Sequence, residues 1–507
     1  MASAKDFANR VPITVALMLA TVMNSLDTTI ANVALPHMQG SLSASQDQIT
    51  WVLTSYIIAA AIMTPLTGWL SVRIGRKQMF LFSIAGFTVA SMLCGAAANI
   101  GEIVAYRLAQ GICGAALIPL SQATVLDIFP AKQVPQVMSI WGMGTMLGPI
   151  MGPLVGGYLT DNFSWRWVFY INLPVGILAF AGVWLFMGRD DGARARPFDF
   201  VGFAALVLAM GAFQLMMDRG STQDWFNSGE IWIDAILAAI GFYVFLVQTL
   251  TAAHPFFDRA LALDRNFVTC NIFGFFTGLM LFSTMALFPP MMQTLLGYSV
   301  WQAGVISMPR GIGTFISMFL VGRLVGRVDI RLILLIGLSL SSIALWQMSR
   351  FDLSMNATPM VVSGFLQGLG MGLLFMPLSV LAFATLPPHL RPEGTSVFTL
   401  VRNLGSSIGI ALMTSILARQ LSVSHSDMAA AVQPGSPTMN AGLPAQFNPA
   451  LNAGLQTLNG EITRQASMVA YVDVFRLMTI MTFCAIPMLL IMRPPRVGGR
   501  AVEMAVE

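Results

Sequence analysis

Charged residues are scarce in this chain of 507 residues. Only 10% of the residues are Asp, Glu, Lys or Arg, whereas 56% are hydrophobic. A soluble globular domain carries roughly 25% charged residues, so the composition excludes that class. The net charge of +4 is small and is not gathered into one basic segment, so no nucleic-acid partner is indicated. Most of the protein surface is expected to face the lipid bilayer.

Cysteine and histidine are also rare, with four of each. The cysteines lie in apolar segments without paired spacing, and the histidines lie singly in loops, so neither a disulfide framework nor a metal site is expected. The chain has no Gly-x-x-x-x-Gly-Lys loop for holding nucleotide phosphates. No cofactor is therefore expected, and ATP is not indicated as the energy source. The four cysteines, interpreted as packing residues, are Cys94, Cys113, Cys270 and Cys484.

Long apolar segments make up most of the remainder. Each is about 20 residues long, enough to cross a hydrocarbon core of about 30 Å, and about fourteen occur between Val11 and Met492. Backbone groups in lipid must be satisfied within the segment, and such long runs favour helices over barrel strands. The first run, Val11 to Leu35, is too long for a signal-peptide core and is expected to remain as an anchor. The sequence predicts an all-α polytopic membrane protein.

An internal repeat divides these segments. Two residue pairs recur 257 positions later, which favours duplication over chance. The pairs are Gln110-Gly111 with Gln367-Gly368, and Gly148 and Gly152 with Gly405 and Gly409. We expect an N-terminal six-helix bundle over residues 1–190, two inserted transmembrane helices over 198–252 and a C-terminal six-helix bundle over 258–495. Parallel repeats of this kind place a substrate site near the bilayer midplane between the halves.

The positive charges indicate an orientation. If the N-terminus is cytoplasmic, most of the 27 lysines and arginines fall on the cytoplasmic side. Both termini are then cytoplasmic, and the number of spans is even. On the outside, residues 419–468 form a long segment rich in Ala, Asn, Gln, Pro and Gly, including Pro434 to Pro437. We expect it to be largely irregular, either a flexible loop or a docking surface for another protein.

Two charges inside the spans lie at similar depth. Asp27 is about 24 Å into the first span from the cytoplasm, and Arg107 is about 9 Å into the fourth span from outside. An unpaired charge in a span costs roughly 2.5–3.5 kcal/mol, so these side chains should face a cavity or each other. Two interpretations stay open at this point: a functional pair, and a structural ion pair or snorkelling from the outer interface.

Glycine repeats every four residues in the fifth span, which places the glycines on one helix face. Such a groove lets another backbone approach closely. The prolines beside it each remove a backbone hydrogen bond, so both plain helix packing and a bent, functional helix fit the pattern. The residues are Gly144, Gly148, Gly152 and Gly156, with Pro149, Pro153 and Gly157.

Four motifs together resemble the major facilitator superfamily, and within it the fourteen-span drug:proton antiporters of the EmrB type. They are Leu26 to Pro36, the basic turn Gly68 to Phe80, Arg107 to Gly111, and the glycine ladder with its signature Gly148 to Leu159. The resemblance implies two six-helix bundles plus two inserted helices. It also implies that Asp27 and Arg107 serve proton coupling, and that the protein is a transporter and not an enzyme.

The function implied is proton-driven efflux of hydrophobic or amphipathic compounds, such as drugs, across the bacterial inner membrane. The resemblance also implies a periplasmic membrane-fusion adaptor and an outer-membrane channel as partners, with residues 419–468 as the expected place of adaptor contact. Two alternatives remain: a proton-coupled uptake carrier of the same fold, and a membrane enzyme or receptor. An enzyme would need clustered polar catalytic groups near one face, which the sequence does not show.

The basic turn departs from the family pattern at one position. Val72 stands where the family usually has an aspartate, which puts a latch built on that carboxylate in doubt. The basic side chains are read either as a plain positive-inside anchor or as groups that bind lipid headgroups or the other half. The turn residues concerned are Gly68, Arg73, Gly75, Arg76 and Lys77.

Several further residues are candidates for the cavity or the substrate. Arg310 and Arg402 lie inside spans of the second half, which has no acid at comparable depth, so they are expected either to attract anionic substrates or to bind interface carbonyls. Methionine and phenylalanine suit an adaptable apolar lining. The other candidates are Thr28, Asn32, Gln110, Phe276, Met280, Gln367 and Asn403.

Overall fold

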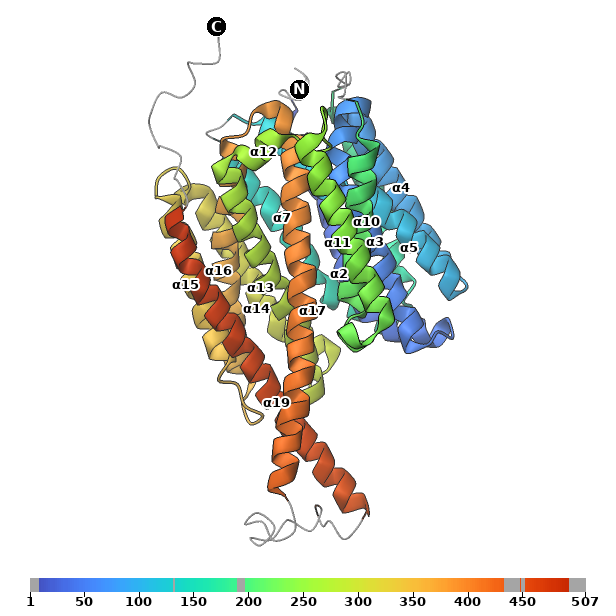
Figure 1. Ribbon diagram of the computed structural model, residues 1–507, viewed down its shortest axis with the longest axis vertical. Coiled ribbons are helices and arrows are strands. Elements are labelled where there is room, and N and C mark those ends of the chain that lie inside the picture. The colour runs from blue at the N-terminus through green and yellow to red at the C-terminus, as the bar shows by residue number, and fades with distance from the viewer. Residues whose placement is uncertain (1–8, 131–132, 189–196, 433–446, 448–451, 492–507) are drawn as a thin grey trace.

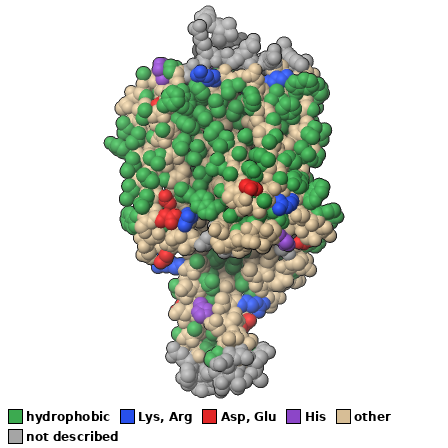
Figure 2. All heavy atoms as spheres, turned by 90° about the vertical axis from the view of Figure 1, so that its right-hand side faces the viewer, with side chains coloured by type: hydrophobic (Ala, Val, Ile, Leu, Met, Phe, Trp, Pro, Cys, Tyr) green, Lys and Arg blue, Asp and Glu red, His purple; other side chains and the backbone are tan. Residues whose placement is uncertain are grey.

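Helices account for nearly all of the computed structural model, which describes residues 9–130, 133–188, 197–432, 447 and 452–491. Thirteen of the described helical segments are long and apolar enough to cross a membrane. On the face that Figure 2 shows, their exposed side chains form a broad apolar belt, with charged side chains gathered toward its two edges. The predicted all-α membrane fold is confirmed.

The first half runs from α2 to α9. Asn99 begins α5 by accepting a hydrogen bond from the Glu102 backbone N–H, as an N-cap residue should. α5 and α6 follow each other within one span, Ile100–Ile128, and α8 and α9 within another, Trp167–Phe186. The helices are α2 (Arg10–Ser41), α3 (Gln46–Ile74), α4 (Arg76–Ala96), α5 (Ile100–Gly114), α6 (Leu117–Ile128), α7 (Val134–Asn162), α8 (Trp167–Tyr170) and α9 (Asn172–Phe186).

The second half repeats this plan from α13 onward. α3 and α14 begin with the same capping box, formed by Ser45 with Gln48 and by Ser299 with Gln302. The helices are α12 (Arg259–Leu263), α13 (Arg265–Leu295), α14 (Val300–Leu324), α15 (Ile330–Met348), α16 (Ala357–Ala384), α17 (Arg391–Ala431) and α19 (Asn452–Ala485), followed by a 3₁₀ segment, Ile486–Ile491.

The glycine-rich helix α7 is the fourteenth long helix. It is 29 residues long but is not among the thirteen segments that pass by apolar composition. Glycine and proline contribute little hydropathy, so α7 is placed in the bundle by its contacts with α2 and α14. The expected count of about fourteen spans includes this helix.

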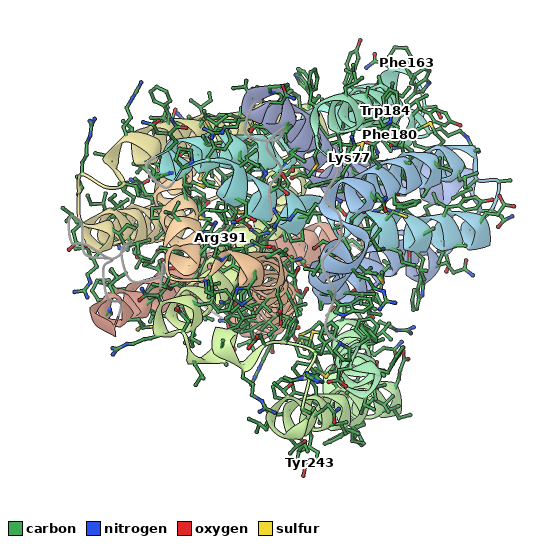
Figure 3. The ribbon with its side chains drawn as sticks, turned by 90° about the horizontal axis from the view of Figure 1, so that it is seen from above. Lys77, Phe163, Phe180, Trp184, Tyr243 and Arg391 are labelled. Atoms are coloured by element: carbon green, nitrogen blue, oxygen red, sulfur yellow. The ribbon has the colours of Figure 1, made fainter. Side chains whose placement is uncertain are left out.

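Two inserted helices, α10 (Phe200–Arg219) and α11 (Gly229–Thr251), pack against each other beside the two halves. Gly241 of α11 lies against the backbone of α10, where a Cβ atom would approach the Ala209 nitrogen to 2.6 Å. α10 contacts α3 and α17, whereas α11 exposes large apolar side chains. Tyr243, 68% exposed, lies at the outer edge of this pair (Figure 3), so α11 is the lipid-facing member.

We call the face at which α2 begins and α19 ends the terminal face, and the opposite one the stalk face. At the stalk face, α17 and α19 continue past the other helices as a helical pair, the stalk (Figure 1). α17 has 41 residues, about 60 Å at 1.5 Å per residue, twice the hydrocarbon core. The prediction of an irregular segment over 419–468 is wrong at both ends, because helix continues to Ala431 and resumes at Asn452. Pro434 to Pro437 lie outside the described residues.

The two halves meet along α7 with α14 and along α3 and α6 with α17. Near the terminal face, the hydroxyls of Thr67 and Ser396 lie 3.1 Å apart across this boundary. Gly68 sits directly on the backbone of Glu393, where a Cβ atom would be 3.0 Å from its Cα. The halves are therefore closed against each other at the terminal face.

Candidate functional site

The centre of the first half is a buried ion pair. Arg107 Nη1 on α5 lies 2.6 Å from Asp27 Oδ2 on α2, and the two side chains are 1% and 0% exposed. The sequence predicts that these charges lie at similar depth and face either a cavity or each other. In the structure they face each other and form a direct ion pair. In a lipid-embedded bundle, pairing removes the cost of burying either charge alone.

Two neutral amides complete the surroundings of the Asp27 carboxylate. Gln110 Nε2 donates to Oδ1 at 2.8 Å, and Asn172 Nδ2 donates to the same oxygen at 2.9 Å. Asn172 also donates to the Ser91 hydroxyl at 2.9 Å. The carboxylate thus receives hydrogen bonds from α5 and α9 in addition to the arginine. These donors stabilise the charged form of a carboxyl group.

Arg107 is held equally firmly. Its Nε donates to the Val52 carbonyl of α3 at 3.0 Å, and its Nη1 also donates to Gln110 Oε1 at 2.9 Å. Its guanidinium carbon lies 4.3 Å from the centre of the Tyr56 ring, within cation–π range. A planar guanidinium can make these contacts together, whereas an ammonium group cannot. The arginine therefore joins α2, α3 and α5 around one carboxylate.

The glycine ladder positions α2, the helix that carries Asp27. A Cβ atom at Gly148 would overlap Ser25, and one at Gly152 would overlap Thr29. The Ser25 hydroxyl donates to the Thr145 carbonyl of α7 at 2.7 Å, and the Thr29 hydroxyl to the Gly148 carbonyl at 3.0 Å. The ladder is thus a groove filled by α2, within two residues of Asp27. The predicted close approach of another backbone is observed.

The other residues of the ladder are part of the same helix. Pro149 and Pro153 lie within α7, and Gly144, Gly156 and Gly157 are buried. A Cβ atom at Gly144 would come closest to the flexible end of Met18, at 3.1 Å, so the contact is looser there than at Gly148. In the second half, Gly405 and Gly409 form the equivalent groove on α17, against the backbone of α13. The duplicated glycines therefore do the same packing in both halves.

Most other candidates lie apart from the Asp27 pair. Thr28 donates to the Ser25 carbonyl of its own helix, and Asn32 is exposed. Phe276 is partly buried beside Phe275, and Met280 is buried in the second half. Of the cavity candidates named from the sequence, only Gln110 contacts Asp27 or Arg107 through a described hydrogen bond.

Arg310 and Arg402, the two candidate arginines of the second half, contact different helices. The Arg310 guanidinium lies 5.1 Å from the centre of the Phe288 ring on α13, and that of Arg402 lies 5.0 Å from the centre of the Phe375 ring on α16. Neither forms an ion pair among the described residues. Asn403 accepts at its backbone carbonyl from Ser406, and its side chain does not neutralise Arg402.

Asp127 links the basic turn to the second half, a connection that the sequence did not reveal. Arg76 Nη2 lies 2.6 Å from Asp127 Oδ2 at the end of α6, and Arg391 Nη1 of the second half lies 2.7 Å from Asp127 Oδ1. Arg391 lies near the middle of the body when the molecule is viewed from above (Figure 3). The ion pair between the halves at this face thus uses a carboxylate of α6.

The remaining turn residues have local roles. The Lys77 ammonium donates to the backbone carbonyls of Trp184 and Met187, both at 2.7 Å. Arg73 lies 5.1 Å from the centre of the Trp69 ring. Gly75 has a φ of 94°, which favours glycine, and it both ends α3 and begins α4. Among the described residues, no group of three or more His, Cys, Asp and Glu could hold a metal ion.

Comparison with known proteins gives a matching family and similar relatives over most of the chain. Residues 17–410 match the family described as Major Facilitator Superfamily. The chain is 35% identical over 436 residues to "Multidrug export protein EmrB" of Escherichia coli strain K12, covering 86% of this chain and 85% of that protein. It is 32% identical over 490 residues to "Fatty acid resistance protein FarB" of Neisseria gonorrhoeae, covering 96% and 97%.

Solved structures share the fold at low sequence identity. The xylose symporter XylE, described as a major facilitator superfamily proton:xylose symporter, superposes with a TM-score of 0.60 at 13% identity, covering 95% of this chain and 96% of that one. The human organic anion transporter MFSD10 gives a TM-score of 0.60 at 13% identity, with 93% and 99% covered. These two structures support the fold alone.

Proposed function

Because the chain belongs to the major facilitator superfamily, we propose that it exports hydrophobic or amphipathic small molecules in exchange for protons. The observation that carries the proposal is the buried Asp27–Arg107 pair with its amide donors, set in a chain similar to multidrug export proteins along most of its length. Transport is the class of activity, and no catalytic role is assigned to any residue.

The proposed mechanism uses the two charge states of Asp27. When the carboxyl group is charged, it accepts from Arg107, Gln110 and Asn172 and holds α2, α5 and α9 together. A proton on this group removes the ion pair and leaves Arg107 with a buried, uncompensated charge. That state favours a rearrangement in which Arg107 finds water or another acceptor. Proton uptake is thus coupled to movement of the helices that the pair joins.

The halves are proposed to move as units about this site. Residues 1–190 and 258–495 would rock against each other, with 198–252 remaining attached beside them. The terminal face is closed in this structure, with Arg391 paired to Asp127, and the transport cycle would include a state open toward the stalk face. Release of substrate on that side and proton entry from it would then precede the return to the opposite state.

Efflux from proteoliposomes tests the proposal. The purified chain is reconstituted, a lipophilic dye is trapped, and a proton gradient is imposed and then collapsed with an ionophore. Export should follow the gradient and stop when it collapses. Export that persists without a gradient would refute proton coupling. Gradient-driven movement of dye only in the same direction as the protons would instead indicate an uptake carrier.

The location proposed is the bacterial inner membrane, with the terminal face in the cytoplasm. Lys and Arg are biased toward cytoplasmic segments of membrane proteins. Arg76, Lys77 and Arg391 all lie toward the terminal face, which supports this orientation. The stalk then projects into the periplasm.

A periplasmic membrane-fusion adaptor, which would lead to an outer-membrane channel, is the proposed partner of the stalk. Helix continues on both sides of the hairpin to Ala431 and from Asn452, and His425 lies 3.1 Å from Asn459 across it. Exposed apolar side chains on it include Val423 and Leu455, 46% and 47% exposed. A variant with residues 424–460 replaced by a short flexible linker should still export dye in proteoliposomes but lose adaptor binding. Retained adaptor binding would refute this assignment.

A further inference from the structure

The second half contains a copy of the Asp27 site in which a hydroxyl replaces the carboxylate. Gln110 donates through Nε2 to Asp27 at 2.8 Å, and its repeat counterpart Gln367 donates through Nε2 to the Thr284 hydroxyl at 3.0 Å. Thr284 follows Asp27 by the same 257 positions that separate the two glutamines. The helix-to-helix hydrogen bond is therefore kept in both halves, but the acid is present only in the first.

The cation is present in both halves but comes from different helices. Gly364, 257 positions after Arg107, has no side chain. Arg310 of α14 lies next to it, because a Cβ atom added to Gly364 would be 3.9 Å from the Arg310 Cβ atom. Arg310 stands where Tyr56 stands in the first half: a Cβ atom at Gly111 would overlap the Tyr56 carbonyl, and one at Gly368 would overlap the Arg310 carbonyl. Tyr56 lies against Arg107 in the first half, and the second half has Arg310 at the position equivalent to Tyr56.

Arg310 has no anionic partner among the residues that the structure describes. The residue is only 8% exposed, and its Nε and Nη2 atoms make no hydrogen bond within that part of the chain. Gln367 Oε1 is likewise buried there without a partner. The Phe288 ring offsets part of the positive charge but accepts no conventional hydrogen bond. A buried guanidinium with two free donors is costly unless something completes it.

The free donors define what would complete the site. Nε–H and Nη2–H form one edge of the guanidinium plane, and a carboxylate can accept from both at once. The Thr284 hydroxyl donates to the Met280 carbonyl at 2.8 Å and accepts from Gln367. No acid among the described residues pairs with Arg310, so this edge of the guanidinium is open to an outside acceptor. An external carboxylate would restore the charge balance that Asp27 provides in the first half.

The site lies beside the boundary between the halves. Gly311, next to Arg310 in the chain, packs against Ile150 of α7 in the first half. Arg310 therefore adjoins, within one residue, the surface that the two halves share. Phe276 and Met280 lie on α13, two turns and one turn from Thr284 toward the terminal face, where an apolar tail could extend.

We propose that Arg310, which lies against Gly364 and Gly368 of α16 and beside the Phe288 ring, one turn of α13 from Thr284, binds the carboxylate of an amphipathic monocarboxylate substrate. This inference rests on the proposed transport function and names its substrate class. In this account, Asp27 of the first half binds and releases the proton. Arg310 of the second half binds the carboxylate of the substrate. Neutral and cationic compounds would use the apolar lining without this contact.

Equilibrium binding to the purified full chain in detergent tests the proposal without any proton gradient. The probes are octanoate and octyltrimethylammonium, which share a chain length and differ in charge. Arg310→Gln should weaken octanoate binding about tenfold or more, the effect of losing a charge-assisted bidentate contact. Binding of octyltrimethylammonium should stay unchanged. This variant removes a buried unpaired charge, so the fold is expected to tolerate it.

A second pair of variants separates charge from shape. Thr284→Asp gives Arg310 an internal partner and should also weaken octanoate binding, although the arginine remains. Thr284→Asn, the uncharged control of the same shape, should bind octanoate as the unaltered chain does. The proposal is overturned if the unaltered chain binds no octanoate, if both charge variants bind it normally, or if they lose both probes equally. Octanoate that binds but is not exported would contradict the transport function and leave this site standing.

Discussion

Asp27 and Arg107, 80 positions apart in the chain, form a 2.6 Å ion pair that is almost completely enclosed by the first half. Each partner has further hydrogen bonds, so the pair joins four helices, α2, α3, α5 and α9, in place of a simple bridge between two. Loss of the negative charge by protonation is therefore felt at several helices at once. This relationship is the basis for the first two predictions.

Arg107→Lys should abolish gradient-driven export while the chain still inserts in the membrane. A lysine keeps the charge near Asp27 but cannot also bond the Val52 carbonyl and Gln110 from one planar group. Dye efflux from proteoliposomes measures the effect. Arg73→Lys, at an arginine stacked on Trp69 near the terminal face, serves as the control and should export normally. Full export by Arg107→Lys would mean that charge alone matters here.

Asn172→Leu should slow gradient-driven export. Its amide donates both to the Asp27 carboxylate and to the Ser91 hydroxyl, so leucine removes the hydrogen bonds by which α9 holds the ion pair. The measurement is the initial efflux rate at a fixed gradient. Asn162→Leu, which removes only a bond to the Tyr158 carbonyl of its own helix, should leave the rate unchanged. An unchanged rate in Asn172→Leu would show that this donor does not support the site.

Gly152→Ala should destabilise the protein by about 1–3 kcal/mol, because the added methyl group overpacks the contact with Thr29. Gly144→Ala is the matched control on the same helix face, where the nearest atom to the methyl group would be the flexible end of Met18, at 3.1 Å. Thermal unfolding of the two variants in detergent gives the comparison. Equal melting temperatures would contradict the tight α2–α7 contact.

Arg391→Gln should weaken the closure of the terminal face. It removes the interhalf ion pair with Asp127 but leaves Arg76 to compensate that carboxylate, so no buried charge is orphaned. Spin labels placed on the two halves at this face should show a larger population of long distances. Each 1.4 kcal/mol lost corresponds to about a tenfold shift in the populations. Distance distributions equal to those of the unaltered chain would exclude a closing role.

The sequence predicted the spans, the similar depth of Asp27 and Arg107, and the groove along α7, because apolar length and four-residue spacing are local patterns. It could not predict Asn172, Ser91 or Asp127, since an amide, a hydroxyl or an acid near a span end is common and only the fold brings it to the site. The stalk was missed for another reason. Its polar, alanine-rich composition resembles a loop, and helix there is supported by pairing of α17 with α19.

The place of Arg310 against Gly364 and Gly368 was also beyond the sequence. Arg310 and Arg402 stand out in the sequence because the second half has no acid at comparable depth. The repeat offset alone, however, pairs Arg107 with Gly364 and not with Arg310. Only the packing of Gly111 on Tyr56 and of Gly368 on Arg310 shows that the cation has moved to another helix. In a duplicated fold, contacts between helices show which side chains of the two halves correspond. Sequence spacing alone does not contain this information.

Proton release on substrate binding tests the central claim most directly. Purified protein in weakly buffered detergent is mixed with a substrate that itself carries no titratable group, and the pH is recorded. If Asp27 exchanges its proton for substrate, the unaltered chain should release protons in a pH-dependent amount, and Asp27→Asn should bind the same substrate and release none. Equal proton release from Asp27→Asn would contradict the assignment of proton coupling to the Asp27–Arg107 pair.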